Sequence, residues 1–205
     1  MELSEWQVIG NKADAMEPMD WEVIGSRREY SVEPWFRIDR ESLRLPDGRV
    51  LNDFYRIDMP DFAMTVAYDA SGRQVLVKEY KPGPRSTTLS PAAGLVDGDE
   101  TPFQAARREL LEETGRVSDD WYCLGSFVVD ANRHCGTMHL FLALNARVVQ
   151  AAIPENGQIL PVVLMNDDEV FQSLASGAFS VLPAAAAISI AHAARSRNAP
   201  LVPAI

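Results

Sequence analysis

The hydrophobic and polar positions of this chain alternate through most of its first half, change to a helical spacing near its centre, and then alternate again. Alternation over short runs predicts half-buried strands. The predicted strands lie at residues 21–24, 36–45, 54–57, 63–68, 75–80, 121–129, 138–145 and 162–165. An Asp47-Gly48 pair predicts a tight turn between the second and third of them.

The clearest helix signal covers residues 101–115. Thr101 is a suitable N-cap, and Gln104 three residues later completes a capping box. Gly115 is the residue expected just after the helix. A second helix is predicted to begin at Asp167, where acidic residues favour an N-terminus. A last helix is predicted to begin after Ser180, a suitable cap, and to end at about Arg195. Strands on both sides of a central helix, with later helices, indicate the α+β class.

Composition narrows the function. The chain has 205 residues, enough for one well-packed domain. A net charge of −10 argues against a basic surface for nucleic-acid backbones. The sequence contains no apolar run long enough to cross a bilayer, so no membrane association is expected. The acidic opening predicts no secretory signal, and Cys123 (expected in the core) and Cys135 (expected at the surface) predict reduced thiols in a cytoplasmic protein.

The candidate chemistry lies at the end of the central helix. Glu109, Glu112 and Glu113 are spaced so that all three fall on one face, where their charges repel one another. They also occupy the helix end where the macrodipole favours cations. A bound hard cation relieves both costs, and oxygen ligands suit Mg²⁺ or Mn²⁺. The alternative is an ordinary solvated acidic helix.

These residues belong to a longer pattern that resembles the Nudix box. The matching positions are Gly94, Glu100, Arg108, Glu109, Leu110, Glu112, Glu113 and Gly115. The pattern departs once, because Arg116 stands where an aliphatic residue is usual. The resemblance implies an α/β/α sandwich with a mixed sheet, preceded by an N-terminal subdomain of antiparallel strands.

Segments outside the box resemble the ADP-ribose pyrophosphatase branch of that family. They include Pro34-Trp35-Phe36-Arg37, Val77-Lys78-Glu79-Tyr80-Lys81 and Met138-His139-Leu140-Phe141-Leu142. The branch implies a homodimer that exchanges N-terminal strands and cleaves the pyrophosphate of ADP-ribose or a related nucleoside diphosphate sugar. We therefore expect a partly disordered extension (1–19), a dimerising strand subdomain (20–57) and a Nudix hydrolase domain (58–205).

The resemblance also implies residue roles. Glu109 and Glu113 match the metal ligands, Glu112 lies close behind, and the carbonyl of Ala93 is a further ligand. Arg108 and Glu100 pair to hold the loop against the helix, supported by Gly94 and Gly115. Glu112 and Arg108 are also catalytic candidates, although an ordinary ion pair is the alternative for Arg108.

The general base is less well determined by the sequence. Glu155 is the one carboxylate between Asp130 and Asp167, so it is a candidate by elimination, and a solvated loop acid is the equal alternative. The region before the box departs from the family, because Ser90 stands where relatives usually carry glutamate. Lys81 stands where many relatives carry arginine and is expected to contact phosphate as a point charge.

Substrate recognition has several candidates. Trp35 and Phe54 are aromatic platforms for a base, with core packing as the alternative, and Arg133 is positioned in a polar loop that could touch substrate. Two other functions stay open: hydrolysis of nucleoside triphosphates or dinucleotides, and sensing of a nucleotide sugar without turnover.

Overall fold

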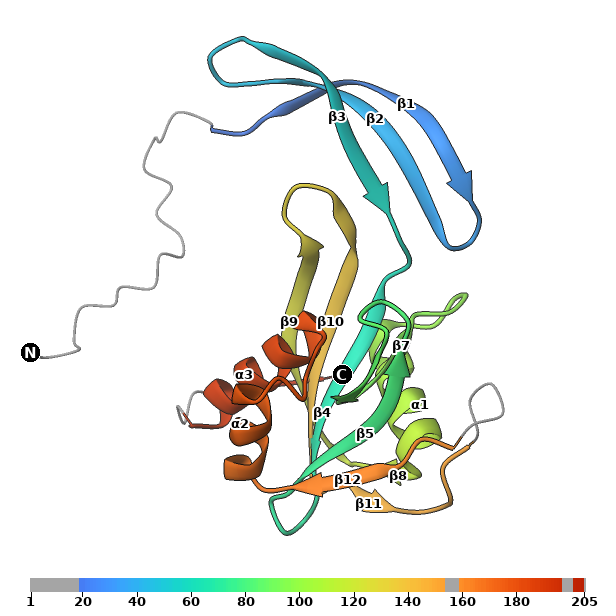
Figure 1. Cartoon of the computed structure of the whole chain (residues 1–205), viewed down its shortest axis with the longest axis vertical. Helices are drawn as coiled ribbons and strands as arrows, with labels where there is room; N and C mark the ends of the chain where they lie inside the picture. Colours follow the sequence, from blue (N-terminus) through green and yellow to red (C-terminus); the bar gives the residue numbers. More distant parts are fainter. Residues whose placement is uncertain (1–18, 154–158, 197–200, 205) are drawn as a thin grey trace, which may run out of the picture.

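The computed structural model describes residues 19–153, 159–196 and 201–204 (Figure 1). Within these residues one mixed sheet contains eleven strands, in the order β1-β2-β3-β10-β4-β5-β12 with four strands attached beside this path. Its strands are β1 (Glu22–Val32), β2 (Phe36–Arg44), β3 (Val50–Asp58), β4 (Phe62–Tyr68), β5 (Gln74–Lys81), β6 (Ser86–Ser90), β7 (Ala92–Leu95), β9 (Asp120–Asp130), β10 (His134–Leu144), β12 (Val162–Met165) and β13 (Val202–Pro203). Strands β8 (Arg116–Val117) and β11 (Arg147–Val148) form a separate pair.

Helices cover both faces of the sheet, which confirms the predicted α/β/α sandwich of the α+β class. On one face, helix α1 (Pro102–Thr114) packs Leu110 into a cluster with Phe141 of β10. On the other face, α2 (Asp167–Ala175) contributes Val170 and α3 (Leu182–Ser196) contributes Ile188 to a cluster with Leu140 of β10. Leu140 and Phe141 are neighbours in one strand, so the alternation of β10 supplies both cores.

The sheet opens where the functional cavity lies. Strands β4 and β5 pair only at Ala67–Val75 and Tyr68–Gln74, and then they separate. Beyond that point β7 pairs with β4, and β6 pairs with β5. Neither β6 nor β7 was predicted from the sequence, because both are short and lack a clear alternation. The separation of β4 from β5 leaves room for side chains between the two branches of the sheet.

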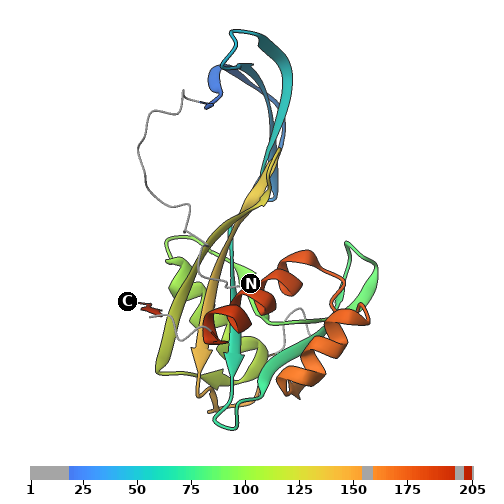
Figure 2. The same cartoon turned by 90° about the vertical axis from the view of Figure 1, so that its left-hand side faces the viewer.

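Strands β1, β2 and β3 form an antiparallel arm that extends away from the helices (Figure 2). The predicted strand at residues 21–24 is the first part of a longer β1, because its polar continuation is paired along β2. The arm meets β10 through one parallel pair, His134 with Ile57. The domain boundary at residue 57 and the role of the arm in dimerisation stay predictions.

One prediction for the cysteines was wrong. Cys123 is exposed and Cys135 is partly buried, the reverse of what their sequence surroundings indicated. The burial of Cys123 was inferred from the apolar run around it, but an irregularity in the pairing of β9 with β10 lies beside Cys123, and such irregularities re-aim side chains. None of the described helices is both long enough and apolar enough to cross a membrane.

Candidate active site

Helix α1 presents the acidic residues because both of its ends are fixed locally. The Thr101 hydroxyl accepts a hydrogen bond from Gln104 N at 3.2 Å, and Thr101 N donates to Gln104 Oε1 at 2.7 Å. At the other end Gly115 adopts a left-handed φ of 66°, and its N–H bonds Leu111 O. A side chain at Gly115 would also overlap Gln150 O. The predicted capping box and terminal glycine are therefore present.

A cavity of about 770 Å³ lies between α1, β7 and the β5–β6 branch. Seven of the predicted site residues line it: Lys81, Ala93, Gly94, Arg108, Glu109, Glu112 and Glu113. Residues that the sequence did not single out complete the wall, among them Phe62, Met64, Glu79 and Tyr80. The α1 end of the cavity is acidic, whereas β4 and β5 line it with the apolar side chains of Phe62 and Met64 and with the ion pair of Glu79 and Lys81. Such a mixed lining suits a ligand with both a charged and an uncharged part.

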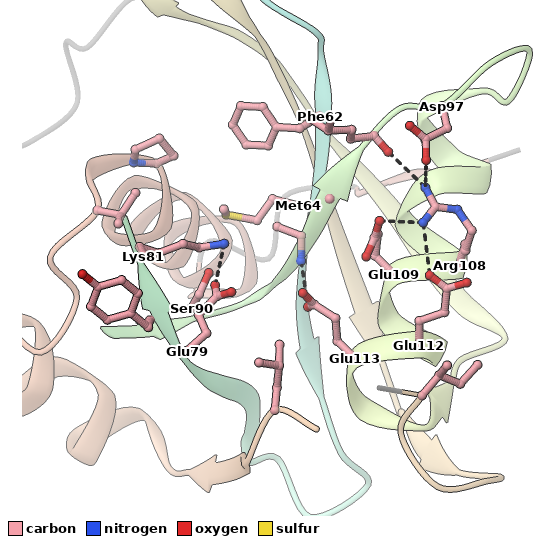
Figure 3. Close-up of a pocket in the computed structure, with 18 of the residues that line it drawn as sticks. Phe62, Met64, Glu79, Lys81, Ser90, Asp97, Arg108, Glu109, Glu112 and Glu113 are labelled. Carbon is pink, nitrogen blue, oxygen red and sulfur yellow. Dashed lines mark hydrogen bonds and ion pairs between the residues drawn. The ribbon is translucent and has the colours of Figure 1, made fainter. Parts of the chain in front are cut away.

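Arg108 is the centre of an ion-pair network at the mouth of this cavity (Figure 3). Its Nη2 donates to Glu100 Oε1 at 2.6 Å and to Leu95 O at 3.0 Å. Its Nη1 donates to Glu109 Oε1 at 2.6 Å and to Glu112 Oε2 at 3.2 Å. The hydrogen bond from Arg108 lowers the pKa of Glu100, whose carboxylate in turn raises the pKa of Arg108. Arg108 therefore joins the loop after β7 to α1.

Glu113 is the most unusual titratable group of the site. Its side chain is buried, and Oε2 accepts a hydrogen bond from Ala93 N at 3.1 Å. Burial raises the pKa of Glu113 to about 9, and the charges of Glu79 and then Glu109 add to the effect. In the metal-free protein this carboxyl is therefore protonated at neutral pH, or it must be neutralised by a cation.

Gly94 is required by the position of Glu109. A Cβ built on residue 94 would overlap the Glu109 carboxylate, so only glycine lets that carboxylate lie against β7. Ala63 of β4 pairs with Gly94 on the other side, which fixes the strand in place. The packing of a carboxylate on bare backbone places Glu109 close to the Ala93 peptide.

The donor set fits a hard divalent cation, although no group of three or more His, Cys, Asp or Glu side chains is gathered as a metal cluster in the described part of the chain. Glu109 and Glu112 accept hydrogen bonds from Arg108, and Glu113 accepts one from Ala93 N. Every candidate ligand is an oxygen, and a cation would relieve the burial of Glu113. The predicted metal ligands therefore line one cavity, and their carboxylates point toward Arg108 and Ala93 N.

Three predicted residues lie elsewhere. Trp35 is exposed in the turn between β1 and β2, and Phe54 of β3 packs edge-on against Trp21 at 6.3 Å between ring centroids. Arg133 lies in the β9–β10 turn, where its carbonyl accepts a hydrogen bond from Ile57 N. None of these three lines the cavity of its own chain. Glu155 lies outside the described residues.

The aromatic residues that do line the cavity are Phe62 and Tyr80. Sequence reasoning missed Phe62 because it begins a buried strand and is typical of a core residue. It missed Glu79, which lies two residues before Lys81 on β5 and pairs with it at 2.8 Å. Strand alternation placed Glu79 and Lys81 on one face, and this was the signal available.

Comparison with known proteins identifies the family. The model of the NUDIX domain matches residues 60–185, which is more than half of the chain. The chain belongs to the Nudix family. As the sequence predicts, it is a Nudix pyrophosphohydrolase, and enzymes of this family generally use divalent metal ions. A solved structure described as an ADP compounds hydrolase superposes with a TM-score of 0.73 at 20% identity, covering 89% of this chain and 97% of that one.

Proposed function

We propose that this Nudix protein hydrolyses the pyrophosphate of ADP-ribose or a related nucleoside diphosphate sugar, giving a nucleoside monophosphate and a sugar phosphate. The observation that carries the proposal is the buried carboxylate of Glu113 beside Glu109, at the acidic end of a cavity large enough for a nucleotide. Such carboxylates are costly to bury as anions unless a cation accompanies them.

The substrate class is supported by the extent of the structural likeness. A match over 89% of the chain reaches beyond residues 60–185, the region that the family model covers. The likeness therefore includes strands outside the hydrolase domain itself, in a protein described as an ADP compounds hydrolase. Phe62 and Tyr80, which line the cavity, would contact the base or sugar.

The residues would divide the work as follows. Glu109, Glu113 and the Ala93 carbonyl would hold Mg²⁺ or Mn²⁺, with Glu112 adjacent. A bound divalent cation supplies charge neutralisation for the pyrophosphate and acidifies water. Lys81, partly exposed on one side of the cavity and paired with Glu79, would attract a phosphate group as a point charge. Arg108 would hold the carboxylates of α1 and the loop after β7 in fixed positions relative to each other.

Two candidates could remove a proton from the attacking water. Glu112 lies at the cavity mouth, held by Arg108 Nη1 at 3.2 Å and otherwise partly open to solvent. Glu155 follows Ile153 and precedes Leu160, and both of these described residues line the cavity. Comparison of Glu112→Gln with Glu155→Gln distinguishes them, because the base variant loses kcat steeply while the other retains most of it.

We also propose that two chains associate through the arm and that the protein acts in the cytoplasm. Large apolar side chains of the arm and of the nearby β9–β10 hairpin are exposed, among them Trp21, Tyr30, Trp35, Phe127 and Val128. An exposed apolar surface of this kind favours association. Trp35 and Phe54 would then serve the second chain of the dimer. Two free cysteines agree with a reducing compartment.

The test is product release from a panel of nucleoside diphosphate sugars, nucleoside triphosphates and dinucleotides, each with Mg²⁺ and with Mn²⁺. Selective cleavage of ADP-ribose or another sugar nucleotide supports the proposal, and the inactive control is Glu109→Gln. Preference for triphosphates or dinucleotides would replace the substrate class. Binding without turnover across the panel would indicate a sensor.

A further inference from the structure

The turn between α2 and α3, residues 176–181, forms part of the wall of the cavity. Val181 at its end and Pro183 in the first turn of α3 both line the cavity, whereas Leu182 between them is 78% exposed. Neither lining residue belongs to the Nudix box, and neither carries a polar side chain. This wall therefore offers contact to an uncharged part of a ligand and not to its phosphates.

The turn lies beside the β5–β6 branch of the sheet, close to Lys81. Ser86 of β6 is the register partner of Lys81, and its hydroxyl lies 3.4 Å from the hydroxyl of Ser180 in the turn. Figure 3 shows Lys81 on this side of the cavity and Arg108 across from it on α1. The turn is therefore next to the basic residue that was assigned to a phosphate group, on the side opposite the acidic helix.

Thr88 of β6 fastens the turn to the sheet. Its hydroxyl donates to Ala178 O at 3.1 Å, with Leu89 O nearly as close at 3.2 Å, and it accepts a hydrogen bond from Ser180 N at 3.0 Å. Leu89 N also donates to Ala178 O at 3.0 Å. Because Thr88 is only 2% exposed, water has little access to take the place of its hydroxyl.

A second attachment keeps the turn on the sheet independently of this hydroxyl. Phe179, between the two residues that Thr88 bonds, is 7% exposed and belongs to the core cluster that also contains Leu89 and Ile188. An apolar contact is not directional, whereas a hydrogen bond fixes the position of its partners. Loss of the Thr88 hydroxyl would therefore leave the turn docked but allow it to shift against the cavity.

We infer that Val181 and Pro183 contact the sugar of the nucleoside diphosphate sugar, and that Thr88 is the positioning residue that sets their place in the wall. The inference rests on the proposed function, because it assigns the sugar to one wall of the same cavity. A phosphate at Lys81 brings the sugar that it carries to the adjacent turn, where the C–H face of the ring packs on the two apolar side chains. Thr88 acts through the turn and does not touch the substrate.

The experiment measures steady-state hydrolysis of ADP-ribose and competitive inhibition by AMP, which lacks the second sugar. Thr88→Val has the same shape but cannot accept the hydrogen bond from Ser180 N. It is expected to raise KM for ADP-ribose about ten-fold while kcat stays within about two-fold, because the lost contact is made equally in the ground and transition states. The inhibition constant of AMP is expected to stay unchanged. Val181→Ala is expected to give the same pattern.

Two variants of β6 serve as controls. Thr88→Ser keeps the hydroxyl and is expected to retain the wild-type KM. Thr87→Val makes the same chemical change at the neighbouring, exposed threonine, and it is expected to alter neither constant. Thermal unfolding of every variant shows whether the fold is kept.

Three results would overturn the inference. Equal weakening of ADP-ribose and AMP in Thr88→Val would indicate a general loosening of the cavity. An unchanged KM in both Thr88→Val and Val181→Ala would remove the turn from the sugar site, while the activity of the wild type would leave the proposed function standing. A wild-type protein that cleaves no nucleoside diphosphate sugar would overturn the proposed function and, with it, this inference.

Discussion

The carboxylate of Glu109 lies against the backbone of Gly94, so closely that a methyl group on residue 94 would overlap it. The contact joins β7 to α1 at the point where the metal ligands are expected. Because the overlapping atoms are the end of a flexible side chain, an added methyl group displaces the carboxylate more easily than it displaces the backbone. Gly94 is therefore needed to position the Glu109 carboxylate more than to stabilise the fold.

Gly94→Ala tests this relationship. The expected result is a fall in kcat/KM on the order of 100-fold, because a ligand displaced by about 1 Å costs that much, with only a small change in unfolding temperature. Steady-state kinetics and thermal unfolding measure the two effects. Gly98→Ala is the control, because a Cβ there meets no atom and any cost would come from its positive φ of 52°. Full activity in Gly94→Ala would contradict the placement of Glu109 in the site.

Glu113 predicts a pH dependence of stability. Its pKa is raised from 4.5 to about 9 in the metal-free fold, chiefly by burial. Between these values the folded protein holds a proton that the unfolded chain has lost, so the free energy of unfolding falls as pH rises from about 4.5 to about 9. Glu113→Gln should flatten this slope and stabilise the metal-free protein at pH 8, while greatly reducing turnover.

Urea denaturation of metal-stripped protein between pH 5 and pH 9 measures the effect. Addition of Mg²⁺ or Mn²⁺ should stabilise the wild type at pH 8 and leave Glu113→Gln almost unchanged, because a cation replaces the proton of Glu113. A slope that is identical in the two proteins would show that another group titrates, and it would remove Glu113 from this role.

Arg108 is expected to stabilise the site as a connector. Arg108→Met should lower the free energy of unfolding by about 1–3 kcal/mol, because it removes hydrogen bonds between charged groups that are only partly exposed. It removes the guanidinium that Glu100, Glu109 and Glu112 share, so bound Mn²⁺ should recover part of the loss. The neighbouring Arg107→Met is the control, because Arg107 is exposed and its guanidinium lies over the Phe103 ring, apart from the carboxylates. Equal destabilisation by the two variants would contradict the network.

How much the sequence predicts depends on how local the cause is. The limits of α1 follow from Thr101, Gln104 and Gly115, which lie within the helix and at its ends, and the structure confirms all three. Strands β6 and β7 depend on the separation of β4 from β5, which is a tertiary event. Phe54 was predicted to contact the substrate, but it lies on β3 in the arm and does not line the cavity of its own chain. The alternation of the arm strands does not reveal in which direction the arm extends.

The candidate site divides in the same way. The Nudix box fixes Glu109, Glu112 and Glu113 on one helix, so one periodicity suffices to place them together. Glu79 comes from β5, some thirty residues earlier in the sequence, and only the folded structure shows that it lines the same cavity as Glu113. Ser90 shows the reverse limit. Its departure from the family pattern was visible in the sequence, but only the structure shows that Ser90 lines the cavity and that its hydroxyl donates to Pro91 O.

The exposed β9–β10 hairpin tests the proposed dimer. Val128 on β9 is 56% exposed near the arm, and a charge there would have to be buried if two chains associate through this surface. Val128→Asp is expected to shift the protein toward the monomer in sedimentation velocity and to raise KM, because the arm of the second chain would no longer reach the cavity. Val148→Asp is the matched control, since Val148 is 62% exposed in β11 and lies away from the arm. A wild-type protein that sediments as a monomer would refute the dimer, and a Val128→Asp dimer would place the interface elsewhere.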